Sequence, residues 1–230
     1  MGCHRRMVAN ERFLEELPEV IAQFPGLKVL EKDGYPILSG FIELIAEDGE
    51  LQDQYEIEVH PVQDYPYSFP LVYEVGETLP RNIDWHIYPD GHFCLAVPLE
   101  ERLACQAGIR LKAFIQNQVL GFLYSQTFRK QNGFFYKERA HGILGRLQYY
   151  REQLGISKLS SIRKVLSVLN SGKEGPPDGK CYCGSGKKFR KCHRRTWRTL
   201  IQHAGDLIQQ DYQEINELIA LLNRKAPSNT

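Results

Sequence analysis

Three cysteines and one histidine lie close together near the end of the sequence: Cys181, Cys183, Cys192 and His193. Two thiols one residue apart can bind the same tetrahedral Zn²⁺ from a tight turn, and the adjacent cysteine and histidine complete a Cys₃His set. Gly184 and Gly186, between the two pairs, let the backbone wrap around the ion. Because protein side chains fill all four positions, we expect a structural zinc site. The alternative, four unrelated side chains, leaves a segment of about 50 residues with too small a core to fold.

The segment 178–195 resembles the SEC-C motif, the zinc module found at the end of the SecA translocation ATPase and in many other bacterial proteins. The resemblance implies a zinc-held, protein-binding appendage without an activity of its own. Eight basic side chains occur here without an acidic neighbour: Lys180, Lys187, Lys188, Arg190, Lys191, Arg194, Arg195 and Arg198. They could bind nucleic acid or an acidic partner. We expect a solvated basic face instead.

A second candidate site is Cys94, which follows an Asp-Gly turn and has histidines eight and two residues before it, His86 and His92. A loop cysteine with a nearby histidine has the parts of an activated nucleophile. We expect His86 to orient the site or to donate a hydrogen bond to an oxyanion, unless it only pins the loop through the backbone. His92 and Cys94 face the same way if the chain is extended, so His92 is a reserve general base. The alternative for Cys94 is a simply buried thiol between apolar neighbours.

The first half of the chain has the pattern of a helix followed by a sheet. Apolar residues from Phe13 to Phe24 repeat at helical spacing behind a possible Asn10 cap, and Pro18 is expected to kink or interrupt that helix. Short apolar runs between turn residues then predict a four-stranded antiparallel meander over 27–30, 37–46, 51–59 and 71–75. In the third strand polar residues alternate with apolar ones, which places His60 on the wet face.

The remaining elements are a long loop and several helices. Residues 76–101 have too many Pro and Gly and too little periodicity for an element, and loops of that length are usually functional. Helical apolar spacing follows over 111–123, 140–154, 159–169 and 197–222. We therefore predict an α+β fold. Its predicted parts are a domain at 1–156, a helix and linker at 157–179, and a zinc module with a terminal helix at 180–230.

Over residues 10–154 the chain resembles the ubiquitin-conjugating enzymes. A Tyr-Pro-x-x-x-Pro element at 65–70 and a Gly-x-x-Cys-Leu element at 91–95 match the motifs that bracket the active site of that family. The family fold is an N-terminal helix, a four-stranded meander and further helices. The resemblance implies that Cys94 forms a thioester and that His86 assists it.

The chain departs from the eukaryotic enzymes in two places. It reads His86-Ile87-Tyr88 where they carry His-Pro-Asn, and it lacks their Trp-containing stretch beyond the cysteine. In both places the chain resembles the divergent prokaryotic relatives of these enzymes. It also resembles them in the His-Gly turn at 141–142, which precedes the Tyr-Tyr-Arg-Glu helix at 149–152.

Standalone proteins of this prokaryotic kind accompany a cGAS-like nucleotidyltransferase in short type II CBASS anti-phage operons. The resemblance therefore implies that the C-terminal glycine of such a partner is the acyl group carried by Cys94. Two other classes stay open. The chain could be a catalytically inactive binding module, or a cysteine hydrolase that uses Cys94 and a histidine. It contains no Gly-x-Gly-x-x-Gly fingerprint, so another protein must activate the acyl donor or the thioester must form by exchange.

Composition limits the class of protein. The 230 residues are 42% hydrophobic and carry 29 basic against 28 acidic side chains, a net charge of +1, which excludes a disordered chain or one coated by nucleic acid. The longest apolar stretch, at 119–124, is far shorter than the about 20 residues of a membrane-spanning helix, so no membrane contact is expected. Six unevenly spaced cysteines and acidic residues close to the start favour a reduced, cytoplasmic protein. Lipidation at Gly2 or Cys3 is a remote alternative.

Overall fold

A computed structural model describes residues 10–225, which form two compact units. The first unit consists of residues 10–96 and 104–138, and the second of residues 97–103 and 139–225. Each unit has its own hydrophobic core. No helix in residues 10–225 combines the length and the apolar character that crossing a membrane requires.

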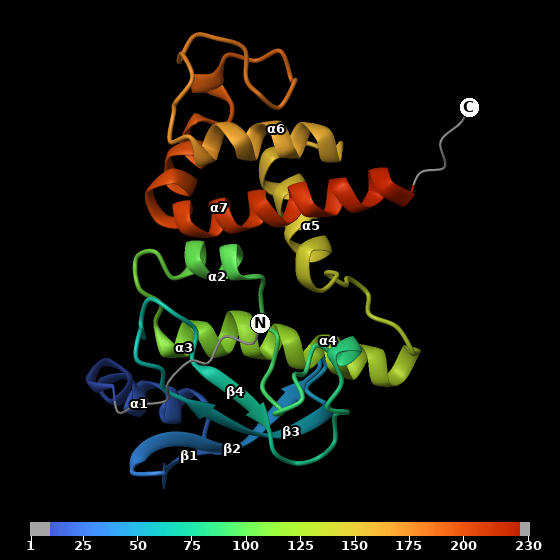
Figure 1. Ribbon diagram of the computed structural model, residues 1–230. Helices are drawn as coiled ribbons and strands as arrows, with labels where there is room; N and C mark the ends of the chain where they lie inside the picture. The colour runs from blue at the N-terminus through green and yellow to red at the C-terminus, as the bar shows by residue number, and fades with distance from the viewer. Residues whose placement is uncertain (1–9, 226–230) are drawn as a thin grey trace. The chain divides into compact units, whose positions relative to one another are not determined.

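The first unit is built on an antiparallel sheet with the strand order β1-β2-β3-β4 (Figure 1). Its strands are β1 (Leu27–Lys32), β2 (Tyr35–Ile45), β3 (Leu51–His60) and β4 (Leu71–Glu74). Its helices are α1 (Glu11–Gln23), the short η1 (Ile83–Trp85), and α3 (Leu111–Phe114), η2 (Ile115–Val119) and α4 (Leu120–Asn132), the last three running without a break. The predicted α+β fold, with an N-terminal helix, a four-stranded antiparallel sheet and later helices, is confirmed.

The core of the first unit lies between one face of this sheet and the helices. Residues of β2 and β3 that point to this face are buried: Leu38, Ile42, Leu44, Tyr55, Ile57 and Val59. Apolar side chains of the helices complete the cluster: Phe13, Leu17, Val20, Phe114, Ile115, Val119 and Leu123. The strict alternation along β3 explains why this strand was predictable, since period 2 places every second residue on one face.

Helix α1 begins as predicted but runs through its proline. Asn10 caps it, because the Asn10 Oδ1 atom accepts a hydrogen bond from the Phe13 N–H at 3.0 Å. Pro18 neither ends nor splits the helix. Proline removes the hydrogen bond to the carbonyl four residues earlier, that of Leu14. Leu14 is 37% exposed, so water can reach this turn of the helix and replace the lost bond.

His60 is buried, so its predicted place on the wet face of β3 is wrong. Its side chain is 3% exposed and contacts the rings of Tyr35 and Tyr73 at centroid distances of 6.3 and 4.9 Å. The imidazole Nε2 atom lies 2.8 Å from a Glu58 oxygen. Burial lowers the pKa of His60, although Glu58 opposes that shift. At this end the outer face of the sheet carries an aromatic layer, which the alternation of β3 alone could not reveal.

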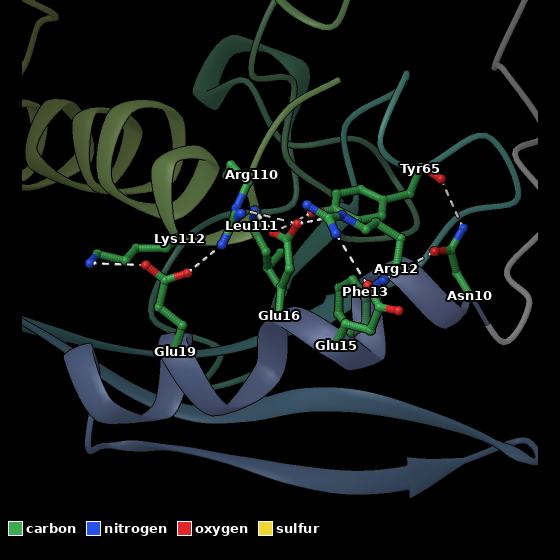
Figure 2. A network of polar contacts seen from close by, with 10 residues as sticks. All are labelled: Asn10, Arg12, Phe13, Glu15, Glu16, Glu19, Tyr65, Arg110, Leu111 and Lys112. Atoms are coloured by element: carbon green, nitrogen blue, oxygen red, sulfur yellow. Dashed lines mark hydrogen bonds and ion pairs between the residues drawn. The ribbon is translucent and has the colours of Figure 1, made fainter. Parts of the chain in front are cut away.

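A buried carboxylate joins α1 to the start of α3 (Figure 2). Glu16 is 3% exposed, and its Oε2 atom accepts hydrogen bonds from the Tyr65 hydroxyl at 2.9 Å and from the Leu111 N–H at 2.6 Å. Its Oε1 atom lies 2.8 Å from the Arg12 guanidinium and 3.4 Å from that of Arg110. One acidic side chain therefore neutralises two cations and caps a helix whose first N–H groups have no partner within the helix.

Replacing this carboxylate should loosen the first unit alone. We expect Glu16→Gln to lower the free energy of unfolding of the first unit by about 2 kcal/mol. The reason is that hydrogen bonds to a charged group are stronger than those between neutral groups. Hydrogen exchange followed by mass spectrometry checks this, with faster exchange expected in peptides from α1 and α3. Glu19→Gln is the matched control. Glu19 is 44% exposed and pairs with Arg110 and Lys112 at the surface, where water and salt screen the charges, so its loss should leave the exchange of these peptides nearly unchanged. Equal effects of the two variants would contradict this account.

The second unit consists of helices around a core that also includes the Cys/His loop. Its helices are α5 (Gly142–Leu154), α6 (Leu159–Asn170), the short η3 (Phe189–Lys191) and α7 (Arg194–Lys225), together with most of α2 (Pro98–Ala104). Figure 1 shows α6 and α7 side by side. The backbone of α7 departs from helical geometry at Ala204, which bends this long helix.

The two units divide before Arg139 and not at residue 156, where a domain boundary was predicted. The reason is that α5 and α6 share one core with the zinc-loop segment, including Tyr150, Ile162, Phe189 and Trp197. The segment 157–179 is thus mostly a packed helix, and the residues after 180 do not form a core of their own.

A buried polar cluster ties α5 to α7. The Tyr150 hydroxyl donates to Asp211 at 2.8 Å, and the Arg146 guanidinium donates to the other Asp211 oxygen at 2.7 Å and also to Glu214. Burial raises the pKa of Asp211, while its two partners oppose this. These contacts join α5 to α7, and both helices belong to the second unit.

Candidate functional site

Cys94 lies in a β-hairpin within the segment that was predicted to be a loop. The Cys94 N–H donates to the His86 carbonyl at 2.7 Å, and the Tyr88 N–H donates to the His92 carbonyl at 2.9 Å. The Gly91 N–H closes the turn by donating to the Tyr88 carbonyl at 2.8 Å. The segment 76–101 therefore has more regular structure than expected, since it also contains η1 and the start of α2.

The hairpin buries one face and leaves the other for chemistry. Ile87 and Phe93 pair across it and are 1% and 5% exposed, and Phe93 stacks on Phe122 at 4.3 Å. The Phe93 N–H also donates to the Val72 carbonyl of β4 at 2.8 Å, which fixes the hairpin to the sheet. Because side chains alternate along extended strands, the opposite face presents the half-buried residues Tyr88, His92 and Cys94.

Helix α4 holds the turn that leads into the hairpin. The Gln126 side-chain amide donates to the Trp85 carbonyl at 2.9 Å, and the Arg129 guanidinium lies 4.3 Å from the centre of the Trp85 ring. Asn82 caps η1 through its contact with the Asp84 N–H. These contacts support His86 in a left-handed conformation, with φ of 54°, which side chains rarely adopt.

The Cys94 thiol is half-buried, and burial raises its pKa while a hydrogen bond from the Tyr88 side chain lowers it. A ring nitrogen of His86 lies within 4.8 Å of the Cys94 sulfur. The same imidazole packs edge-on against Phe135 at 5.4 Å and lies 3.7 Å from a Glu138 oxygen. The His86 carbonyl thus pins the loop through the backbone, while its side chain lies near the thiol, where the orienting or donating role expected from the sequence stays a prediction.

His92 and Tyr88 form a second contact pair on this face. Their rings stack at a centroid distance of 4.1 Å and an angle of 16°, and the His92 Nδ1 atom lies 2.6 Å from a carboxylate oxygen of Asp90. Asp90, the first residue of the Asp-Gly turn, thus also holds an imidazole. Tyr88 was not singled out from the sequence, although its place opposite His92 across an Asp-Gly turn indicates a shared face with Cys94.

The four predicted metal ligands converge at the other candidate site. Their ligand atoms all lie within 4.8 Å of one another. The sulfur atoms of Cys183 and Cys192 are 3.7 Å apart, and the His193 Nδ1 atom lies 3.4 Å from the Cys181 sulfur and 3.3 Å from that of Cys192. A tetrahedral zinc with sulfur ligands at about 2.3 Å separates two of them by about 3.8 Å. The Cys₃His set therefore fits a metal ion of this kind.

The loop between the two pairs of ligands has glycine in left-handed conformations where glycine was expected. Gly184 and Gly186 have φ of +78° and +74°, and the Gly184 N–H donates to the Cys181 carbonyl at 3.2 Å. Burial raises the pKa of Cys183, but hydrogen bonds from Ser185 and the neighbouring thiols outweigh it and lower that pKa to about 6. A thiol that loses its proton this readily is suited to bind a cation.

The basic side chains around the loop do have acidic neighbours, contrary to the sequence interpretation. The Asp178 carboxylate lies 3.1 Å from Lys188 and 2.9 Å from Arg190. Glu174 pairs with Arg194, and with Arg198 at 3.0 Å. These two carboxylates precede the cations they pair with by 10 to 24 residues and neutralise part of this face.

Among the described residues, one further cysteine lies outside the two candidate sites: Cys105 is 0% exposed and packs in the core of the first unit. Cys3 and Gly2, considered for lipidation, lie outside the described residues.

Comparisons with known proteins add little to this geometry. No protein-family model and no curated protein matches the chain. Among solved structures, it is similar to the yeast vps23 UEV domain, a ubiquitin E2-like fold, crystallised with a vps27 PSDP peptide. The identity is 18% over 50% of this chain and 83% of that chain, with a TM-score of 0.35. A likeness this low carries no argument, so the function must be argued from the chain's own residues.

Proposed function

We propose that the first unit is an acyltransferase of the ubiquitin-conjugating kind, in which Cys94 carries the C-terminal acyl group of another protein as a thioester. The observation that carries the proposal is the hairpin that holds the half-buried Cys94 sulfur within 4.8 Å of a His86 ring nitrogen. The helix and four-stranded sheet around it agree with the fold that the sequence motifs imply. A half-buried thiol with side-chain donors next to it has the parts that nucleophilic catalysis needs.

The chemistry needs an acyl group that another protein has already activated, as a thioester or an acyl adenylate. Cys94 loses its proton to solvent, and the thiolate attacks the acyl carbon. The carbon–sulfur bond forms as the bond to the leaving thiolate or adenylate breaks, and the leaving group keeps the electron pair. An amine then attacks the new thioester, loses a proton, and displaces the Cys94 thiolate.

The resemblance to the prokaryotic relatives favours one acyl donor, the C-terminal glycine of a cGAS-like nucleotidyltransferase in anti-phage defence. Glycine suits the site because it has no side chain to hinder the approach of its carbonyl to a half-buried sulfur. An extended tail can also offer unpaired backbone groups to a strand edge.

The second unit is proposed to bind one structural zinc ion through Cys181, Cys183, Cys192 and His193. When bound, the metal would supply a cross-link between the two ends of the loop. The cysteines would bind it as thiolates and the histidine through Nδ1, the atom that faces the sulfurs.

The proposed role of His86 can be tested by His86→Ala. Removing a donor to a developing oxyanion typically costs about 10² to 10³ in rate, so single-turnover transfer from a synthetic glycyl-thioester peptide should fall by about that factor. Peptide mass spectrometry at Cys94 gives the rate. Transfer within a few fold of the wild-type rate, with normal folding, would assign the role elsewhere.

One observation favours a second function, a binding module without catalysis. Burial raises the pKa of Cys94, so the reactive thiolate is scarcer than in a free cysteine. A module of this kind should bind the same partner tail and form no adduct. A cysteine hydrolase, the third class, should form an acyl-enzyme that water releases.

A further inference from the structure

His86 has a left-handed backbone conformation, with φ of 54°. A residue with a Cβ atom rarely adopts it, and it persists only where surrounding contacts hold it. The turn ahead of it contributes a hydrogen bond from the His86 N–H to the Ile83 carbonyl at 2.9 Å. The contacts around this turn therefore determine where the imidazole lies.

Arg129 of helix α4 contacts the neighbours of His86 on two sides. Its guanidinium lies 4.3 Å from the centre of the Trp85 ring and 4.5 Å from the centre of the Phe135 ring. It also donates a hydrogen bond to the Asp84 carbonyl. Trp85 directly precedes His86 in the chain, and the Phe135 ring packs edge-on against the imidazole at 5.4 Å. One side chain thus holds both the backbone before His86 and the ring beside it.

The chemistry of arginine suits this place. A guanidinium is planar and weakly hydrated, so it can lie against aromatic rings while its N–H groups still donate hydrogen bonds. Arg129 is half-buried and Phe135 is buried, which limits the water that could compete for these contacts. Gln126, one turn earlier on α4, donates a hydrogen bond from its side-chain amide to the Trp85 carbonyl at 2.9 Å. Helix α4 therefore fixes the residue before His86 at two points.

We infer that Arg129 is a positioning residue of the Cys94 site, which keeps the His86 imidazole beside the sulfur by holding Trp85 and Phe135 in place. A ring nitrogen of His86 lies within 4.8 Å of that sulfur. A misplacement of about 1 Å at a reacting centre can cost about 10²-fold in rate, so the rings that hold the imidazole matter to the reaction. The inference rests on the proposed roles of Cys94 as the nucleophile and of His86 as a donor.

The first test reads the position of His86 in the isolated full-length protein, so it needs no acyl donor. Each histidine ring gives a carbon–proton signal in NMR that depends on nearby aromatic rings, and His86→Ala identifies the signal of His86. We expect Arg129→Leu to shift that signal. The signal of His60 should stay unchanged, because His60 contacts the rings of Tyr35 and Tyr73 in the same unit, and it reports that the unit is folded.

Two further variants separate the guanidinium from any other cation on α4. Arg129→Lys keeps the positive charge and is the second variant if Arg129→Leu folds poorly. Its ammonium cannot lie flat against two rings, so the His86 signal should shift again. Lys130→Met is the matched control, since Lys130 lies 5.0 Å from the Tyr55 ring and 2.8 Å from an Asp53 oxygen. Its loss should leave the His86 signal unchanged.

The second test measures single-turnover transfer from a synthetic glycyl-thioester peptide. We expect Arg129→Leu to lower the rate about ten-fold, because the donor is misplaced and not removed. In a His86→Ala background the same change should have almost no further effect, since Arg129 acts through His86. A loss of similar size in both backgrounds, or an unchanged His86 signal in Arg129→Leu and Arg129→Lys, would overturn the inference. If the signal shifts as expected but no thioester forms on Cys94, the proposed transferase fails while the positioning role stands.

Discussion

Cys183→Ser should remove zinc from the protein and unfold the loop that carries the ligands. Structural zinc contributes a large part of the folding free energy of small modules, with a binding free energy of about 10–16 kcal/mol in zinc-finger peptides at pH 7. Here the loss should extend into the second unit, because Phe189 and Trp197 are 1% exposed in the core beside the ligands. The chain has two tryptophans, so in a Trp85→Phe background the emission of Trp197 reports this unit. We expect a red shift in the variant and on chelation.

The control for this experiment is Cys94→Ser, which removes a half-buried thiol from the other unit. It should keep one equivalent of zinc and the emission of the parent protein. Elemental analysis of the unmodified protein, purified without chelator, gives the number of zinc ions per chain. Less than about half an equivalent, or a Cys183→Ser variant that keeps its zinc, contradicts a closed structural site.

Cys94→Ser should also abolish the thioester. An oxygen in place of the sulfur attacks an activated acyl group more slowly but forms an ester that is harder to cleave. We therefore expect the variant to give either a persistent ester, stable to reducing agent, or a non-covalent complex. Intact-protein mass spectrometry with and without reductant distinguishes these from the labile adduct of the parent.

The same spectra show whether the adduct forms on Cys94 or on another cysteine. Cys105 is fully buried, so Cys105→Ala should leave adduct formation at Cys94 unchanged wherever that variant folds. A reductant-labile adduct that survives in Cys94→Ser would assign the reaction to another cysteine.

Patterns within a few residues of sequence predicted those parts of the fold that depend on neighbouring residues only. The alternation in β3 and the short apolar runs around it indicated the sheet, and Asn10 indicated the start of α1. The metal-ligand set was also readable, because the spacing of Cys181 and Cys183 and the two glycines after them restrict the loop by themselves. Such features need no knowledge of distant residues.

Long-range contacts determined the features that the sequence did not reveal. His60 is buried by Tyr35 and Tyr73, which lie on neighbouring strands. The boundary between the units depends on the contact of Tyr150 with Asp211, which are 61 residues apart. Asp178 and Glu174 neutralise part of the basic face through pairs with residues at least ten positions later in the sequence. The place of Tyr88 opposite His92 became clear only once the register of the hairpin was known.

The central claim is that Cys94 carries a protein's C-terminal acyl group, and peptide mapping of the chain purified with a cGAS-like nucleotidyltransferase tests it most directly. Digestion without added thiol, followed by mass spectrometry, should reveal the partner's terminal glycine joined to the Cys94 peptide by a thioester, which excess thiol such as dithiothreitol cleaves by taking over the acyl group. A complex without any adduct would favour the binding module, and rapid release of free partner would favour hydrolysis. An adduct mapped to Cys105 or Cys3, or a partner tail that cross-links far from Cys94, would contradict the account.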